Sequence, residues 1–561
     1  MPLPRDPSEN QDQAVARSIA HPPEPPDVEE NLAPKPRKKD IKVSYMNLPK
    51  KAQLGILCIA RLADPLAATS VQSYMFYQLK YFDPSASDAK VSTQAGIMIG
   101  SKTAAQVCTG LLWGQLADSD LGGRKTVLVI GLLSSCVSYL GYGFSTSFAS
   151  AIAWQIVGGA MSSNVAITRC IVAEINPEKR FRARALLLLP LCANAGMLLG
   201  PLVGGFLSSS DKEGRWRAHP YATPNIFVAA IYIIAAIGVF FVLEETLETI
   251  RHTEGSFARR KWNTVMSYLF TPAHDYHKLP AVAPEEPTVP TNATSIREQI
   301  VVTDSTPLLS KHLGRLGKPA FHRIWTLNVF CVMFAHFVIA GHLGTFTNLW
   351  AIFLSTPIER SHKQNPPIFF NVGLGMHPRD IGFAMATLGA LGVVLQLIIY
   401  PLLNDRFGTV KVWRAALFIF PIVYLLAPFP SLVASSTSVD DKTAIVWLSM
   451  VCVLVLFVIG RVGVTPATTL LINDCAPHPA VRGTVHTAGT VIDNLSKSVF
   501  PVVTLAIFGQ GLKIGVVGLG FWCLACLAIL ACVASRWVRD GPNDDERVHV
   551  EQEDTSETTR A

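Results

Sequence analysis

Two pairs of charged residues lie inside long apolar stretches of this 561-residue chain. Arg61 and Asp64 are three residues apart in the first stretch, and Asp493 and Lys497 are four residues apart in a later one. On a helix, residues at these spacings share one face. An ionised carboxylate alone in the middle of a bilayer costs at least about 2.5–3.5 kcal/mol, so each must be paired, protonated or open to water. Groups of this kind can take up and release protons.

Asp64 leaves two interpretations open. In the first, its carboxylate binds either a proton or a substrate, but not both. In the second, Arg61 and Asp64 form a permanent structural ion pair. The apolar stretches also contain Arg461, His336 and His342, and we expect these histidines to be hydrogen-bonded core residues rather than proton carriers.

The segment from Gly196 to Gly205 reads GMLLGPLVGG, with further glycines at Gly200 and Gly204 around Pro201. In a membrane helix, glycines four residues apart form a flat face that lets another helix backbone approach closely. The proline removes one helical hydrogen bond and introduces a kink. The pattern therefore predicts a bent helix at a tightly packed interface.

The composition indicates a membrane protein. Half of the residues are hydrophobic and only 16% are charged, whereas soluble domains carry about 25% charged residues. About twelve apolar stretches approach the roughly 20 residues that a helix needs to cross a bilayer. The expected spans are Leu54–Leu79, Ala95–Leu116, Thr126–Phe144, Phe148–Thr168, Ala185–Leu207, Ile226–Leu243, Leu327–Leu354, Ile381–Leu403, Ala415–Pro430, Ala444–Leu471, Val485–Phe508 and Ile514–Ala534. The lipid bilayer is thus an expected partner.

Basic residues cluster beside the apolar stretches, notably before the first, after the second and after the fourth. The positive-inside rule makes these loops cytoplasmic and, with an even number of spans, places both termini inside. The polar segments 1–50, 249–322 and 540–561 cannot bury an apolar core and are expected to be disordered. They flank an N-terminal six-helix bundle at 51–248 and a C-terminal one at 323–539.

The two bundles look like copies of one another. Four residues recur 300 positions later, with Glu174, Pro177, Arg182 and Pro201 matched by Asp474, Pro477, Arg482 and Pro501. A second motif also occurs twice, once after the second span and once, in degenerate form, after the eighth. Its residues are Gly114, Asp118, Gly123, Arg124 and Lys125 in the first copy and Asp405, Arg406 and Gly408 in the second. The carboxylate of such a loop can pair with an arginine or with the positive end of a helix.

Neither nucleic-acid binding nor catalysis is expected. The net charge of +7 comes from short clusters beside apolar stretches. Most of the eleven cysteines lie singly in those stretches, and Cys523 and Cys526 form a C-x-x-C without a second pair, so no metal site is expected. The sequence contains no P-loop, nucleophile-elbow or zinc-protease motif. We therefore expect no enzyme activity and no cofactor.

These motifs carry a family resemblance. The glycine-rich segment resembles the antiporter motif in the fifth span of major facilitator superfamily drug:proton antiporters. The loop from Gly114 resembles the cytoplasmic-loop signature of that superfamily, with two extra residues between Asp118 and Gly123. The surroundings of Asp64 and Pro65 are similar to the first span of fungal members. The resemblance runs through nearly every span and implies an all-α major facilitator fold, with about twelve transmembrane helices in two pseudo-symmetric six-helix bundles.

The resemblance implies secondary active transport by alternating access, specifically proton-coupled efflux of small hydrophobic or amphipathic organic compounds such as drugs or secondary metabolites. The proton is the implied coupling ion, with Asp64 as its first site and Asp493 as its second. Lys497 matches a basic position that is common in the family, so we expect a structural role for it. Gln155 stands where the family has an arginine in the fourth span, and glutamine carries no charge. An uncoupled facilitator or uptake porter is therefore an alternative, and a non-transporting receptor or sensor is another.

A central substrate cavity is expected between the bundles. The polar or aromatic residues expected to face it are Tyr74, Gln106, Asn194, His336, Trp350 and Gln396. We expect the protein to act as a monomer. The plasma membrane is the expected location, with the vacuolar membrane as the alternative because the residues from Asp304 to Leu308 and Leu309 resemble an acidic dileucine sorting signal.

Overall fold

The computed structural model describes residues 48–119, 122–176, 178–209, 219–246, 325–357, 368–370, 373–436, 442–477 and 482–539. The polar segments 249–322 and 540–561 lie outside these residues, as do the first 47 residues of the chain. The sorting-signal residues Leu308 and Leu309 are therefore also outside the described part.

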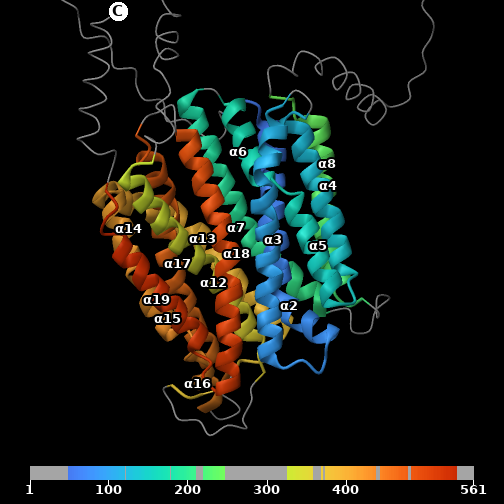
Figure 1. The fold of residues 1–561 in the computed structure, drawn as a ribbon, viewed down its shortest axis with the longest axis vertical. Coiled ribbons are helices and arrows are strands. Elements are labelled where there is room, and N and C mark those ends of the chain that lie inside the picture. The colour runs from blue at the N-terminus through green and yellow to red at the C-terminus, as the bar shows by residue number, and fades with distance from the viewer. Residues whose placement is uncertain are drawn as a thin grey trace, which may run out of the picture. The chain divides into compact units, whose positions relative to one another are not determined.

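Helices make up nearly all of the described part, and those of the first half of the chain lie beside those of the second half (Figure 1). The first half contains α2 (Lys51–Phe82), α3 (Asp88–Ala117), α4 (Arg124–Gly143), α5 (Phe148–Ala160), α6 (Asn164–Ile175), α7 (Lys179–Ser209) and α8 (Ala222–Val242). The second half contains α12 (Leu327–Ser355), α13 (Pro378–Phe407), α14 (Thr409–Leu417), α15 (Ile419–Leu426), α16 (Pro430–Ser436), α17 (Lys442–Asp474), α18 (Arg482–Ile514) and α19 (Leu519–Ala534).

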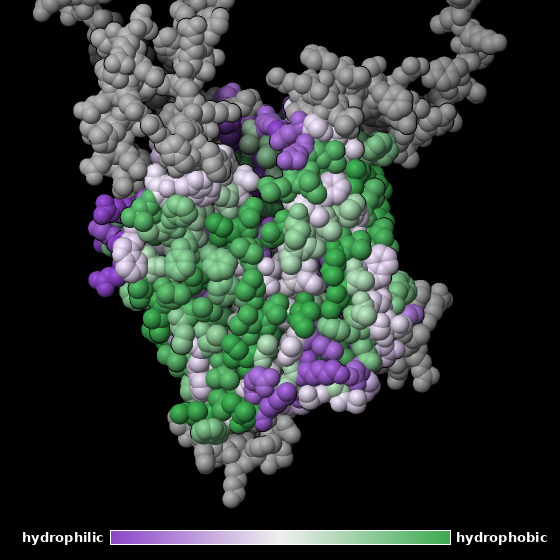
Figure 2. Space-filling model, in the orientation of Figure 1, coloured by the Kyte–Doolittle hydropathy of each residue, from purple (hydrophilic) through white to green (hydrophobic). Residues whose placement is uncertain are grey.

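Ten helical segments of the described residues are long and apolar enough to cross a membrane. The remaining two of the twelve expected spans are α3, which has 30 residues but is less apolar, and α19, which has 16 residues. Hydrophobic residues cover most of the length of the helices, and hydrophilic residues gather near the helix ends (Figure 2). The expected all-α fold with about twelve membrane helices is confirmed.

Two of the expected single spans are broken. The fourth consists of α5 and α6, separated at residues 161–163, and it continues to Ile175 rather than ending at Thr168. Its break follows two glycines and contains two serines, which are weak helix formers. The ninth span consists of α14, α15 and α16, because Pro421 cannot donate a helical hydrogen bond and Pro428 and Pro430 end the next turn.

The two halves meet along two pairs of helices, α7 with α13 and α3 with α18. A methyl group built on Gly382 of α13 would lie 2.5 Å from the carbonyl oxygen of Pro201, and one built on Gly96 of α3 would lie 2.9 Å from that of Pro501. The two prolines that stand 300 residues apart in sequence thus make equivalent contacts across the two halves. The sequence around Pro501 lacks the glycines that surround Pro201. The close approach to α18 is instead permitted by a glycine of the neighbouring helix, Gly96 of α3.

These close contacts lie toward one end of the helices. Gly96 and Gly382 are near the starts of α3 and α13, at the end that carries the α2–α3 turn, which we call the closed end. Near the other end of α3, a methyl group added to Gly114 would have no atom of another element within 4 Å, and the same holds for Gly392 midway along α13. This second end carries the two loop motifs, and we call it the open end. The halves are therefore held together at the closed end.

Candidate functional site

A polar cluster joins the two halves midway along their helices. Arg461 of α17 donates from Nη2 to Oδ1 of Asn194 on α7 at 3.0 Å. Asn194 in turn donates from Nδ2 to Oε1 of Gln396 on α13 at 2.5 Å. The structure thus brings together three residues that the sequence had assigned separately to the cavity or to coupling. Because Asn194 belongs to one half and its two partners to the other, these hydrogen bonds link the two halves directly.

A pocket lies beside the cluster, between the two halves. Its lining residues are Thr69, Gln72, Met197, Pro201, Thr347, Met385, Leu388 and Arg461. Gln72 also donates to Oδ1 of Asn348 on α12 at 2.7 Å, which adds a second hydrogen bond between the halves. The pocket therefore combines apolar side chains with one guanidinium group and several neutral hydrogen-bonding groups, and it is narrow in the described state.

Asp64 is half-buried on α2 and is held by neutral partners. Tyr232 of α8 donates its hydroxyl to Oδ1 of Asp64 at 2.7 Å, and Asn164 donates from Nδ2 at 3.5 Å. Asn164 is the first residue of α6, so the break in the fourth span positions this second donor. Within the part of the chain that is described, Asp64 has no ion-pair partner within 4 Å, and Nε of Arg61 is buried without a hydrogen-bond partner. This geometry differs from the permanent Arg61–Asp64 ion pair.

Lys102, which was not predicted as a site residue, extends the network around Asp64. Its Nζ donates to the hydroxyl of Tyr139 at 2.7 Å and lies 4.7 Å from the centre of that ring. Tyr139 stacks on Tyr232, with ring centres 5.7 Å apart. The sequence does contain a feature that could have identified this residue, because Lys102 is a lone lysine inside the expected span Ala95–Leu116.

Asp493 and Lys497 form the expected pair on α18, with Nζ 2.7 Å from Oδ2. His336 of α12 is close enough to interact electrostatically with both. Arg169 of α6 also faces Asp493 from the other half of the protein and interacts electrostatically with Arg61. Arg169 lies one residue beyond the fourth span expected from hydropathy and was therefore not predicted as a site residue.

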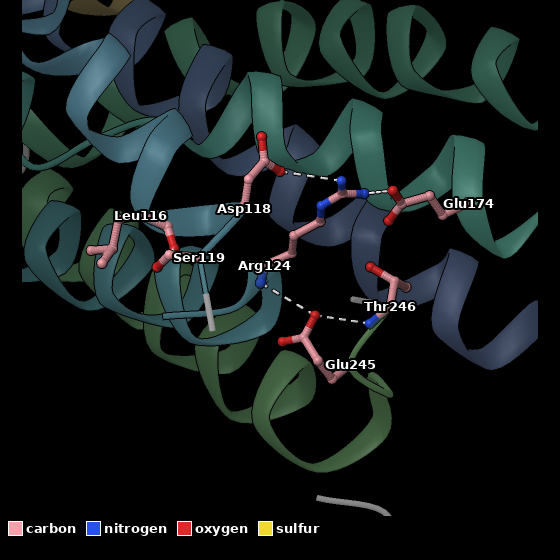
Figure 3. Close-up of polar contacts among 7 residues, drawn as sticks. All are labelled: Leu116, Asp118, Ser119, Arg124, Glu174, Glu245 and Thr246. Carbon is pink, nitrogen blue, oxygen red and sulfur yellow. Dashed lines mark hydrogen bonds and ion pairs between the residues drawn. The ribbon is translucent and has the colours of Figure 1, made fainter. Parts of the chain in front are cut away.

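The first loop motif forms a compact charged cluster at the open end (Figure 3). The guanidinium group of Arg124 contacts Oδ1 of Asp118 at 3.2 Å and also pairs with Glu174 at the end of α6. Two extra residues separate Asp118 from Gly123 relative to the family signature, and the structure nevertheless brings Asp118 to Arg124. Gly123 makes this possible, since it adopts a φ of 72° directly before α4, a conformation that favours glycine.

Glu245 caps the first turn of α4 from the exit of α8. Its Oε1 accepts from the backbone N–H of Arg124 at 3.2 Å, and its Oε2 accepts from that of Lys125 at 3.0 Å. The residue at the N-cap itself is a glycine without a side chain to offer. Glu245 therefore supplies both the missing acceptor and a negative charge at the positive end of the helix.

We expect Glu245→Ala to lower the free energy of unfolding by about 1–3 kcal/mol, because it removes the cap and its interaction with the helix dipole. The measurement is thermal unfolding of the purified protein. Glu244→Ala is the matched control, since Glu244 forms an exposed ion pair with Lys50 at 2.9 Å and such pairs contribute about 0–1 kcal/mol. An equal loss of stability in the two variants would contradict the capping role.

The second loop motif repeats the backbone geometry of the first. Gly408 has a φ of 79° and directly precedes α14, as Gly123 precedes α4. Asp405 and Arg406 occupy the last turn of α13, and the guanidinium group of Arg406 lies 5.5 Å from the centre of the Phe407 ring. The two loops are thus equivalent in position and turn geometry.

The glycine motif of α7 contacts both halves. Methyl groups built on Gly196, Gly200 and Gly204 would lie 2.1–2.7 Å from atoms of α2, within the same half. Gly205 instead faces α13, where an added methyl group would lie 2.5 Å from the carbonyl oxygen of Pro378. Most of the motif therefore fixes α7 on α2, and its last glycine permits the close approach of the other half.

Several expected cavity residues lie elsewhere. Tyr74 is buried within the first half, where its hydroxyl accepts from Asn225 at 2.8 Å. Trp350 is fully buried in an aromatic cluster of the second half, and His342 bonds Tyr424 at 2.8 Å in the same core. Gln106 donates to the carbonyl oxygen of Ser162 at the break between α5 and α6, at 3.3 Å. Gln155 of α5 is 7% exposed.

Comparison with known families identifies the protein. Residues 67–501 match the family model described as Major Facilitator Superfamily. The chain belongs to the major facilitator superfamily. The protein is therefore a multi-pass membrane transporter of small molecules and not an enzyme, as the sequence motifs predicted.

Fungal transporters are among the relatives of this superfamily member. It is 26% identical to the multidrug transporter mfsB of Aspergillus fumigatus, over 87% of this chain and 83% of that protein. It is 24% identical to the efflux pump azaK of Aspergillus niger, over 87% of this chain and 88% of the pump. The solved D-xylose-proton symporter shares the fold, with a TM-score of 0.58 and 12% identity over 89% of this chain and 99% of the symporter.

Proposed function

We propose that this superfamily member exports small organic compounds in exchange for protons, by alternating access. The observation that carries the proposal is the environment of Asp64, a carboxyl group in the middle of a membrane helix whose described partners are a tyrosine hydroxyl and an amide. A carboxylate fixed in an ion pair would stay charged, whereas one with neutral partners can gain and lose a proton as its access to water changes. The efflux relatives support the direction of transport.

The two ends of the helices supply the gates. The described state has contacts between the halves at the closed end, and the positive-inside rule makes the open end cytoplasmic, with both termini on the same side. In the proposed cycle a substrate enters from the cytoplasm at the open end, and the narrow pocket beside Arg461 widens to admit it. Closing the open end and separating the glycine contacts then releases it on the other side. The chain acts as a monomer in the plasma membrane.

The proton gradient is sufficient for this task. One proton moving down about 100 mV releases about 2.3 kcal/mol, and one pH unit adds about 1.4 kcal/mol. Together they sustain roughly a 500-fold concentration ratio of a neutral compound.

We expect transport by the purified protein in liposomes to stop when nigericin collapses the pH gradient and valinomycin collapses the potential. Unchanged uphill transport would overturn the proposal. Turnover also separates transport from sensing, because a receptor would move no more than one equivalent of compound per protein molecule.

The alternative on the same fold is an uncoupled facilitator, and one observation favours it. Gln155 is uncharged, whereas the family resemblance places an arginine at its position. A facilitator would equilibrate a compound across the liposome membrane at the same rate with and without a pH gradient. An exporter would accumulate the compound only with the gradient.

A further inference from the structure

The interior of the membrane segments carries an excess of positive charge. Seven charged side chains lie at least six residues from both ends of their described spans, and five of these seven are basic. The basic residues are Arg61, Lys102, Arg169, Arg461 and Lys497, and the acidic residues are Asp64 and Asp493. Uncompensated charge is costly at this depth in a bilayer, so the excess requires water or a ligand of opposite charge.

The two carboxylates form no close ion pair with the arginines, although Asp64 interacts with Arg61 and Asp493 with Arg169 at longer range. Asp493 is paired with Lys497 at 2.7 Å, and Asp64 is bonded to Tyr232 and Asn164. Among the residues that the structure describes, no carboxylate oxygen lies within 4 Å of Arg61, Arg169 or Arg461. The three guanidinium groups are therefore available to a ligand.

The arginines follow a path from the open end to the pocket. Arg61 lies eight residues before Thr69 of the pocket on α2, or about 12 Å nearer the open end. Its buried Nε lacks a hydrogen-bond partner, although it is a donor. Arg169 is exposed and interacts electrostatically with Arg61. Arg461 lines the pocket itself, where its described acceptors are the neutral side chains of Asn194 and Met197.

We propose that the substrate is an amphipathic organic anion, a compound with a carboxylate, sulfonate or phosphate group on an apolar body. Guanidinium groups bind such oxyanions with paired, charge-assisted hydrogen bonds. Arg61 and Arg169 attract the anion from the open end, and Arg461 binds it in the pocket. Met197, Met385 and Leu388 contact the apolar body. The inference rests on the proposed export function and narrows its substrate class.

An anionic substrate also gives Gln155 a physical explanation. A membrane potential that is negative on the cytoplasmic side drives an anion outward without any proton. The exporter then depends less on a strongly coupled proton site than an exporter of cations does. A transporter of anions can therefore function with Gln155 in place of the arginine.

Equilibrium binding tests the substrate class independently of transport. Fluorescein and rhodamine 123 share a xanthene body and differ in charge, the first being anionic and the second cationic at neutral pH. We expect the purified full-length protein to bind fluorescein at least about tenfold more tightly than rhodamine 123, by fluorescence anisotropy. Arg461→Gln and Arg169→Gln should each weaken fluorescein binding by about tenfold or more, and the corresponding lysine variants should retain part of it.

Lys513→Gln is the matched control, because Lys513 is an exposed residue in the last turn of α18 at the closed end. Tighter binding of rhodamine 123, or unchanged fluorescein binding in both glutamine variants, would overturn the anion site. Arg169 is exposed, so its variant remains informative if Arg461→Gln does not fold. Uphill export of rhodamine 123 alone would overturn the anion site and leave the export function standing. Fluorescein binding without any transport would support the site and overturn the export function.

Discussion

Asp64→Asn is expected to abolish proton-driven transport, so that in liposomes with a gradient of one pH unit and no membrane potential the sustained concentration ratio falls from about tenfold to one. Asparagine has nearly the shape of aspartate and still accepts the hydrogen bond from Tyr232, which is 2.7 Å from Oδ1 in the native protein. It cannot bind or release a proton. The variant should therefore fold, bind substrate and move it down its own gradient. Accumulation in liposomes with an imposed pH gradient measures the loss.

Asp83→Asn provides the control for this experiment. Asp83 lies in the turn after α2, where hydrogen bonds from Lys90 and Ser85 lower the pKa of its carboxyl group to about 2. A group with a pKa that low stays ionised at neutral pH and cannot carry the coupled proton. Its replacement should leave the sustained ratio unchanged. A normal ratio in Asp64→Asn would move the proton site away from α2, with Asp493 as the next position to replace.

The sequence predicted the membrane helices and motifs well, because these depend on local composition. Apolar length predicted the spans, and the two loop motifs marked the equivalent turns at Gly123 and Gly408, both with positive φ. The contacts of Asp64 could not be predicted in the same way. They depend on where α6 begins and on which residue of α8 faces α2, and both are decided by tertiary packing.

Charged residues near the ends of apolar stretches were harder to assign. Arg169 was missed because hydropathy ends the fourth span at the first charged residue, although the helix continues to Ile175. The sequence likewise could not predict whether a side chain faces the cavity or the core of its own half. Tyr74 and Trp350 are polar enough to line a cavity, yet both are fully buried within their own halves, because their large rings contribute more by packing than by contact with water.

The close contact at Gly100 leads to the second large prediction. A methyl group at this position of α3 would lie 2.4 Å from Cγ2 of Val502 and 2.6 Å from the carbonyl oxygen of Ser498, both on α18. Gly100→Leu must therefore push α3 away from α18 at one of the close contacts between the two halves. The 1–3 kcal/mol typical of an inserted side chain would shift the balance between the two states by roughly 5- to 150-fold. We expect transport to fall by a comparable factor, because a cycle needs both states.

Gly100→Leu should also change which end of the protein is open. Measuring the opening therefore distinguishes a shift between the two states from a general loss of folded protein. Spin labels at positions 112 of α3 and 484 of α18, both exposed near the open end, report the separation of the halves there. With the native cysteines replaced, we expect Gly100→Leu to shorten this distance as the open end closes. Gly55→Leu inserts the same side chain on α2, where an added methyl group meets nothing within 4 Å, and should alter neither the distance nor the transport rate. An unchanged distance in Gly100→Leu, in a protein that has kept its fold, would mean that this glycine contact does not control access.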